Sequence, residues 1–163
     1  MTTDRTMQRL EAMADRVELT ELLHRFHHAV DSRDWAAFDH IFVEDAVVEF
    51  VSLNDFEIFG MEGRHVGRDA ILRWVQTGVG PFNFNGAPVH FMANHVFDLD
   101  GDRAASRSYL HEMDLVSGLV ICTGVYDGRH VRVDGSWRIQ SFHLGMWITE
   151  GVRESLVSQR PET

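Results

Sequence analysis

The stretch VHFMANHVFDL at residues 89–99 opens a series of four β-rich runs. The other three are RAASRSYLHEMDL (103–115), LVICTGVYDGRHVRV (119–133) and WRIQSFHLGMW (137–147). The runs at 89–99, 119–133 and 137–147 are rich in β-branched or aromatic residues, and the short connections contain pairs that favour tight turns: Asp100-Gly101, Ser117-Gly118 and Asp134-Gly135. Long strands joined by such short turns predict an antiparallel meander.

The first half of the chain has helical periodicity instead. Apolar residues recur at every third or fourth position over residues 17–30, which is typical of an amphipathic helix. The polar segment Asp31-Ser32-Arg33-Asp34 then breaks this pattern, and a short second helix is predicted over residues 35–42. A third helix is predicted over residues 68–76.

Two shorter β-rich runs lie between the second and third helices, at residues 46–53 and 56–61. Asn54-Asp55 separates them, and this pair tolerates the positive φ of a tight hairpin. Glycines mark residues 63–67 as a connection, and residues 78–86 are predicted to form a loop.

Helices followed by an antiparallel meander indicate an α+β fold. We expect a single domain over residues 1–163, in which a curved antiparallel or mixed sheet wraps around the N-terminal helices as a cone. Its core is predicted over about residues 15–148, and residues 149–163 form a tail or a lid. A sheet curled against helices favours a concave pocket for a small ligand.

Composition narrows the classes of partner and the cellular compartment. Asp and Glu number 25 against 15 Lys and Arg, so the net charge of −10 argues against a nucleic-acid partner. No run approaches the roughly 20 apolar residues of a membrane span, and no signal peptide is evident. Because Cys122 is the single cysteine, a cytoplasmic protein without an internal disulfide is expected.

Two residues stand out as candidates for acid–base chemistry. Asp31 ends the first helix, one turn beyond His27 and His28, so it can border the pocket or simply terminate the helix in solvent. His90 begins the first long strand, where regular alternation places it on one face with Met92 and Asn94, and His95 on the opposite face. Only one of the two histidines can therefore face the pocket if the strand is regular.

The order of several short motifs resembles scytalone dehydratase, hexachlorocyclohexane dehydrochlorinase and the wider SnoaL-like, nuclear-transport-factor-2-like superfamily. The motifs are Val30-Asp31-Ser32-Arg33-Asp34-Trp35, Ala46-Val47-Val48-Glu49-Phe50, His90-Phe91 and Asp134-Gly135-Ser136-Trp137. The resemblance implies a cystatin-like α+β barrel and a catalytic dyad formed by His90 and Asp31. In such a dyad the carboxylate accepts the Nδ1 hydrogen and leaves Nε2 free to take a proton from carbon.

The chain also departs from the family pattern. By resemblance, the two tyrosines with which scytalone dehydratase polarises its substrate fall on Val30 and Phe50, which cannot donate a hydrogen bond. Scytalone itself is therefore not the expected substrate. The same comparison makes Tyr126 a candidate replacement donor in the pocket and Asp114 a candidate second acid.

The predicted pocket is mainly apolar. Its expected members are Tyr126, Trp35, Phe50, Val30, Met92, Asn94, Asp114 and Met146. This composition favours a small hydrophobic cyclic substrate. No phosphate-binding loop, thiolate cluster or H-E-x-x-H pattern occurs, so we expect no cofactor and no metal, and treat His24, His28 and Asp31 as a polar helix face.

The leading hypothesis is a cofactor-independent lyase of the dehydratase or dehydrohalogenase type. An isomerase or cyclase of the ketosteroid-isomerase or polyketide-cyclase type, using the same dyad, is an alternative. So is a non-catalytic binding protein akin to the small subunits of ring-hydroxylating dioxygenases, because one fold hosts many functions. In each case a homodimer or homotrimer is expected.

Overall fold

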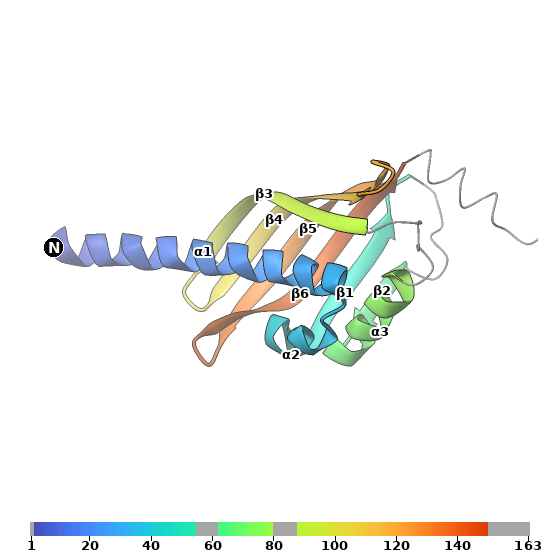
Figure 1. Cartoon of the computed structure of the whole chain (residues 1–163). Helices are drawn as coiled ribbons and strands as arrows, with labels where there is room; N and C mark the ends of the chain where they lie inside the picture. Colours follow the sequence, from blue (N-terminus) through green and yellow to red (C-terminus); the bar gives the residue numbers. More distant parts are fainter. Residues whose placement is uncertain (1, 55–61, 80–87, 150–163) are drawn as a thin grey trace, which may run out of the picture.

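The computed structural model describes residues 2–54, 62–79 and 88–149. Within these residues, three helices and a single 3-10 turn accompany six strands (Figure 1). The helical elements are α1 (Thr2–Ser32), η1 (Trp35–Ala37), α2 (Phe38–Ile41) and α3 (Arg68–Val79). The strands are β1 (Phe42–Ser52), β2 (Gly63–Val66), β3 (Pro88–Asp100), β4 (Arg103–Asp114), β5 (Val120–Val133) and β6 (Ser136–Ile148). The predicted α+β class is confirmed.

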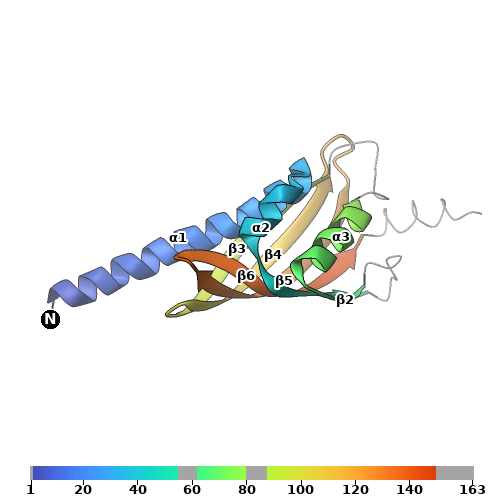
Figure 2. The same ribbon diagram turned by 90° about the horizontal axis from the view of Figure 1, so that it is seen from below.

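The six strands form one mixed sheet in the order β2-β1-β6-β5-β4-β3. Strands β3 to β6 make the predicted antiparallel meander, and β1 joins it by pairing in parallel with β6. The sheet is strongly curved, and the helices lie against its inner side (Figures 1 and 2). In the described residues β2 and β3 are edge strands that do not pair with each other, so the cone stays open and is not a closed barrel.

Helix α1 confirms the predicted periodicity but begins much earlier than residue 17. Its buried side includes Leu19, Leu22, Leu23 and Phe26, and it packs chiefly against β3. The N-terminal part projects beyond the sheet (Figure 1). The pattern missed this part because periodicity marks only the turns that pack against a core, whereas backbone hydrogen bonds continue a helix until a breaker occurs. No described helix combines the length and the apolar character of a membrane span.

Three local predictions need correction or lie outside the structure. The second predicted helix is divided into η1 and α2, and Phe42 already belongs to β1. Residues 63–66, predicted as a connection, form β2 and pair with residues 47–50 of β1. The predicted strand at 56–61 lies outside the described residues. Short strands at a sheet edge are difficult to predict because their formation depends on pairing with a neighbouring strand more than on their own residues.

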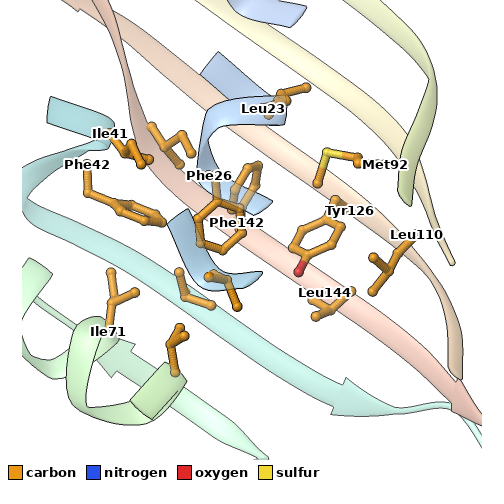
Figure 3. Packing of buried hydrophobic residues seen from close by; sticks show 14 of the residues in the cluster. Leu23, Phe26, Ile41, Phe42, Ile71, Met92, Leu110, Tyr126, Phe142 and Leu144 are labelled. Carbon is orange, nitrogen blue, oxygen red and sulfur yellow. The ribbon is translucent and has the colours of Figure 1, made fainter. Parts of the chain in front are cut away.

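Aromatic side chains fill the space between α1 and the sheet (Figure 3). Phe26 of α1 lies at the centre, with ring centroids 5.4 Å from Phe42, 5.8 Å from Phe142 and 6.5 Å from Tyr126. Large rings that meet edge to face bury much apolar area in a defined geometry. This cluster therefore fixes α1 on the inner face of the sheet.

A β-bulge interrupts β3 and changes which residues face inward. The pairing of β3 with β4 shifts between Ala93 and Val96, and Asn94 has a positive φ of 55°. The extra residue brings His95 to the inner side, where its Nδ1 lies 2.8 Å from Ser108 Oγ, while Asn94 is exposed. The expectation that His90 and His95 lie on opposite faces is wrong, and so is the assignment of Asn94 to the pocket.

Candidate active site

The end of α1 places Asp31 at the edge of the sheet. The Asp34 N–H donates to the Ala29 carbonyl at 2.9 Å and the Arg33 N–H to the Val30 carbonyl at 3.2 Å. Arg33 adopts a left-handed φ of 58°, so the helix ends in a Schellman arrangement with arginine where glycine is usual. The polar segment predicted to stop the helix thus holds Asp31 in its last turn.

Asp31 accepts two hydrogen bonds from His90. Its Oδ1 lies 2.6 Å from His90 Nδ1, and its Oδ2 accepts the backbone N–H of His90 at 3.1 Å. The second bond forms because β3 is an edge strand of the described sheet, and alternate N–H groups of an edge strand point away from their one neighbour. Since a carboxylate only accepts, Nδ1 carries the hydrogen and Nε2 is the nitrogen that can exchange a proton with a ligand.

Glu112 lies beside this pair and was not identified from the sequence. It is directly opposite His90 on β4, and its Oε1 lies 3.8 Å from His90 Nε2. Cys122, the next residue across the sheet on β5, donates its thiol hydrogen to Glu112 Oε2 at 3.2 Å. The sequence contained a signal for Glu112, because strand alternation places it on the same face as Asp114, a predicted pocket residue.

The electrostatic surroundings favour a charged His90. Burial by itself lowers the pKa of His90, but the hydrogen bond to Asp31 and the charges of Glu112 and Asp31 outweigh it, so the pKa is raised above 6.5. Burial raises the pKa of the Cys122 thiol well above its usual value, and the charge of Glu112 adds to this. The row across β3, β4 and β5 therefore has one basic imidazole, one carboxylate and one neutral thiol, and Asp31 of α1 adds a second carboxylate beside the imidazole.

His27 is a second residue that the sequence did not single out. It is 4% exposed, and neither ring nitrogen has a hydrogen-bond partner among the described residues. Its ring centroid lies 5.0 Å from that of His90 and 5.6 Å from that of Tyr126. Burial, followed by the charge of His90, lowers the pKa of His27 well below 6.5. A neutral imidazole with unused hydrogen-bonding capacity beside the dyad is suited to bind a polar group of a ligand.

Replacement of His27 with leucine is expected to stabilise the fold and weaken function. The substitution removes a buried polar group without partners, so the free energy of unfolding should rise by about 1 kcal/mol in a denaturant titration. The same substitution at the exposed His28 should change stability by less than about 0.5 kcal/mol. Destabilisation by His27→Leu would show instead that the imidazole has a partner in solution.

The other predicted pocket residues are mostly buried on the inner side. Tyr126 is buried on β5, and burial strongly raises its pKa, so its hydroxyl keeps its hydrogen and can donate. Its ring lies near Met92, Leu110 and Leu144 (Figure 3). Across the sheet, one row joins Met92, Leu110, Gly124 and Met146, next to the row of His90 and Glu112.

Val30, Phe50 and Trp35 take apolar positions in the interior. Val30 and Phe50 are buried in the core cluster, and Trp35 is partly buried against it. The centroid of Phe50 lies 6.1 Å from that of Trp74 on α3, and Trp35 lies 6.1 Å from Phe38. The burial of Val30 and the ring contacts of Phe50 and Trp35 identify the three as packing residues of the interior.

The Asp114 side chain stabilises a turn and does not take the place of a second acid. Its Oδ1 accepts the backbone N–H groups of Val116 and Ser117, both at 2.8 Å, and the Ser117 hydroxyl at 3.2 Å. The hydrogen bond from the Ser117 N–H is the main cause that lowers the pKa of Asp114. A carboxylate held in this way stabilises the turn between β4 and β5. The acid that faces His90 is Glu112, two residues earlier.

A separate hollow of about 630 Å³ lies on the outer face of the sheet. Alternation along the strands separates it from the dyad, and its lining includes the charged side chains of Glu49, Arg64, Arg107, Asp127 and Arg129. This polar surface does not match the hydrophobic substrate predicted from the sequence. Within residues 2–54, 62–79 and 88–149, no three His, Cys, Asp or Glu side chains gather closely enough to hold a metal ion.

Comparisons with known proteins agree with this architecture. Residues 11–143 match the model of the SnoaL-like domain. The uncharacterized protein Rv2910c of Mycobacterium tuberculosis is 30% identical over 142 residues, which cover 83% of this chain and 88% of the relative.

Solved structures with the same fold include three with 17–22% sequence identity. An NTF2-like protein with a cystatin-like fold from Novosphingobium aromaticivorans has a TM-score of 0.71 and 22% identity, with 96% of each chain covered. LinA has a TM-score of 0.69 and 17% identity, covering 85% of this chain and 89% of its own. A putative scytalone dehydratase from N. aromaticivorans has a TM-score of 0.64 and 20% identity, covering 82% and 84%. The matched domain model and the 30% identical relative place this chain in the SnoaL-like domain family, with the cystatin-like, NTF2-like α+β fold.

Proposed function

We propose that this protein is a cofactor-independent lyase that eliminates water or halide from a small hydrophobic cyclic molecule. The observation that carries the proposal is the 2.6 Å hydrogen bond between Asp31 Oδ1 and His90 Nδ1. It orients the imidazole and leaves Nε2 to transfer protons. Met92 and Leu110, in the row next to His90 and Glu112, support an apolar substrate, and Tyr126 is a candidate donor to its carbonyl oxygen.

The elimination requires two proton transfers. A base removes a proton from the carbon next to a carbonyl, and the electron pair of the broken C–H bond forms the new C=C bond. The C–O or C–halogen bond breaks, and an acid supplies a proton when the leaving group is a hydroxyl. His90 can perform both transfers in turn, and a positioned acid–base group typically contributes about 10²–10⁴-fold in rate.

Isomerisation is a second candidate function, and Glu112 favours it. A second proton-accepting group lies 3.8 Å from His90 Nε2. It would allow a proton to leave one carbon atom of the substrate and return to another without loss of a leaving group. The dyad alone does not distinguish isomerisation from elimination.

Three probes that share one product test the proposal. Elimination of water from 3-hydroxycyclohexanone, elimination of hydrogen chloride from 3-chlorocyclohexanone and isomerisation of cyclohex-3-enone all yield cyclohex-2-enone. We expect the wild-type protein to accelerate at least one of the eliminations, measured by mass spectrometry against a protein-free control. Acceleration of cyclohex-3-enone conversion alone would favour an isomerase. No acceleration, together with tight binding of cyclohexanone, would favour a binding protein.

A further inference from the structure

His90 lies between two carboxylates that come from different elements. Asp31 of α1 is 2.6 Å from Nδ1, and Glu112 of β4 is 3.8 Å from Nε2. The side chains of His90, Asp31 and Glu112 are 14%, 20% and 16% exposed, so solvent screens these charges only in part. Both edges of the imidazole therefore face negative charge.

Among the described residues, the other titratable groups around His90 carry no charge that would oppose this. His27 on α1 has a lowered pKa and is neutral, while Cys122 and Tyr126 on β5 have raised pKa values and keep their hydrogens. The two carboxylates are thus the charged groups that face His90 from α1 and β4. An imidazolium between them is stabilised from both sides.

The two carboxylates differ in how many of their oxygens already accept a hydrogen bond. Asp31 uses one oxygen for the His90 ring and the other for the His90 backbone N–H. Glu112 uses Oε2 to accept the Cys122 thiol, and its Oε1 is directed to the side of His90 Nε2. The Oε1 atom is therefore placed to accept a proton near the nitrogen that can donate one.

We propose that His90 and Glu112 form a two-group acid–base pair, in which His90 begins the reaction as the proton donor and Glu112 as the proton acceptor. This inference rests on the proposed function and divides its two proton transfers between two residues. Glu112 Oε1 takes the proton from carbon, and His90 Nε2–H gives its proton to the departing hydroxyl. One C–H and one C–O bond break, a C=C bond forms, and water leaves, so no oxidant or other reactant is needed.

The register of the sheet gives this pair a stereochemical consequence. His90 and Glu112 are directly paired residues of adjacent strands, and both side chains lie on the inner side. Both proton transfers therefore occur on one face of the substrate. Elimination from 3-hydroxycyclohexanone deuterated on one face of carbon 2 should proceed as a syn elimination.

Titration of the His90 ring by ¹⁵N NMR tests the pair without any substrate. In the wild-type protein we expect both ring nitrogens of His90 to stay protonated above pH 6.5, the ordinary pKa of histidine, because the pKa of His90 is raised. Glu112→Gln should lower the pKa of His90 by about 1, because an opposite charge within about 4–6 Å shifts a pKa by roughly that much or more. The matched control is Glu49→Gln, since Glu49 contacts His143 at 3.3 Å on the outer face of the sheet and should leave the titration of His90 unchanged.

The outcomes separate this inference from the proposed function. A neutral His90 with its proton on Nδ1, unaffected by Glu112→Gln, would overturn the two-group pair and leave His90 as the base of a single dyad. A wild-type protein that converts none of the probes would contradict the proposed function but not the titration. With an active probe, Glu112→Gln should reduce turnover at least about 10²-fold, and Glu112→Asp, which keeps the carboxylate, should retain more activity. Full activity of Glu112→Gln would also overturn the pair.

Discussion

Replacement of His90 with glutamine is expected to reduce turnover of an active probe by about 10²–10⁴-fold. Glutamine can still donate a hydrogen bond to Asp31, which accepts the ring at 2.6 Å in the wild-type protein. It cannot take up or release a proton near neutral pH, so orientation is kept while proton transfer is lost. Initial rates of cyclohex-2-enone formation measure this loss.

The matched control is His95→Gln. His95 lies on the same inner side of β3, but its ring contacts His24 and Ser108 rather than a carboxylate. We expect this variant to keep turnover within a few-fold of the wild-type protein. Unchanged far-ultraviolet circular dichroism of both variants would show that the fold is intact. An active His90→Gln protein would rule out proton transfer by His90 as the source of turnover.

Truncation of Phe26 to alanine is expected to lower the free energy of unfolding by about 3–5 kcal/mol, as for other large buried rings. Phe26 is 3% exposed, and its ring meets those of Phe38, Phe42, Tyr126 and Phe142. Removal of this ring leaves a cavity where α1 packs on the sheet. Denaturant unfolding followed by circular dichroism measures the loss.

Phe91→Ala is the control for that substitution. Phe91 belongs to β3 and is 49% exposed, so its truncation should cost less than about 1 kcal/mol. Equal losses for Phe26→Ala and Phe91→Ala would show that the aromatic cluster does not hold α1 on the sheet. Since Asp31 lies in the last turn of α1, destabilisation at Phe26 should also weaken the contact of Asp31 with His90.

Local sequence information predicted the class of fold, and the motif resemblance predicted that Asp31 and His90 form a pair. The four β-rich runs and their Asp-Gly and Ser-Gly turns predicted β3 to β6, since alternation and turn preferences depend on neighbouring residues. The polar segment after Val30 predicted the end of the helix, and the structure adds the left-handed Arg33 that completes it. The resemblance of motifs paired Asp31 with His90, and the structure brings them within 2.6 Å.

Pairing between strands decided the rest of the candidate site. The bulge at Asn94 turns His95 inward and Asn94 outward, and a one-residue shift of this kind depends on the hydrogen bonds of β4. Register likewise places Glu112 opposite His90, and the burial of His27 depends on how α1 packs on the sheet. By itself, the sequence indicated the α+β order of elements, and its motif resemblance pointed to Asp31 and His90 as a pair. Only the tertiary structure decided that a second carboxylate faces His90 and that Asp114 stabilises a turn, because register and burial are set by contacts between residues distant in the chain.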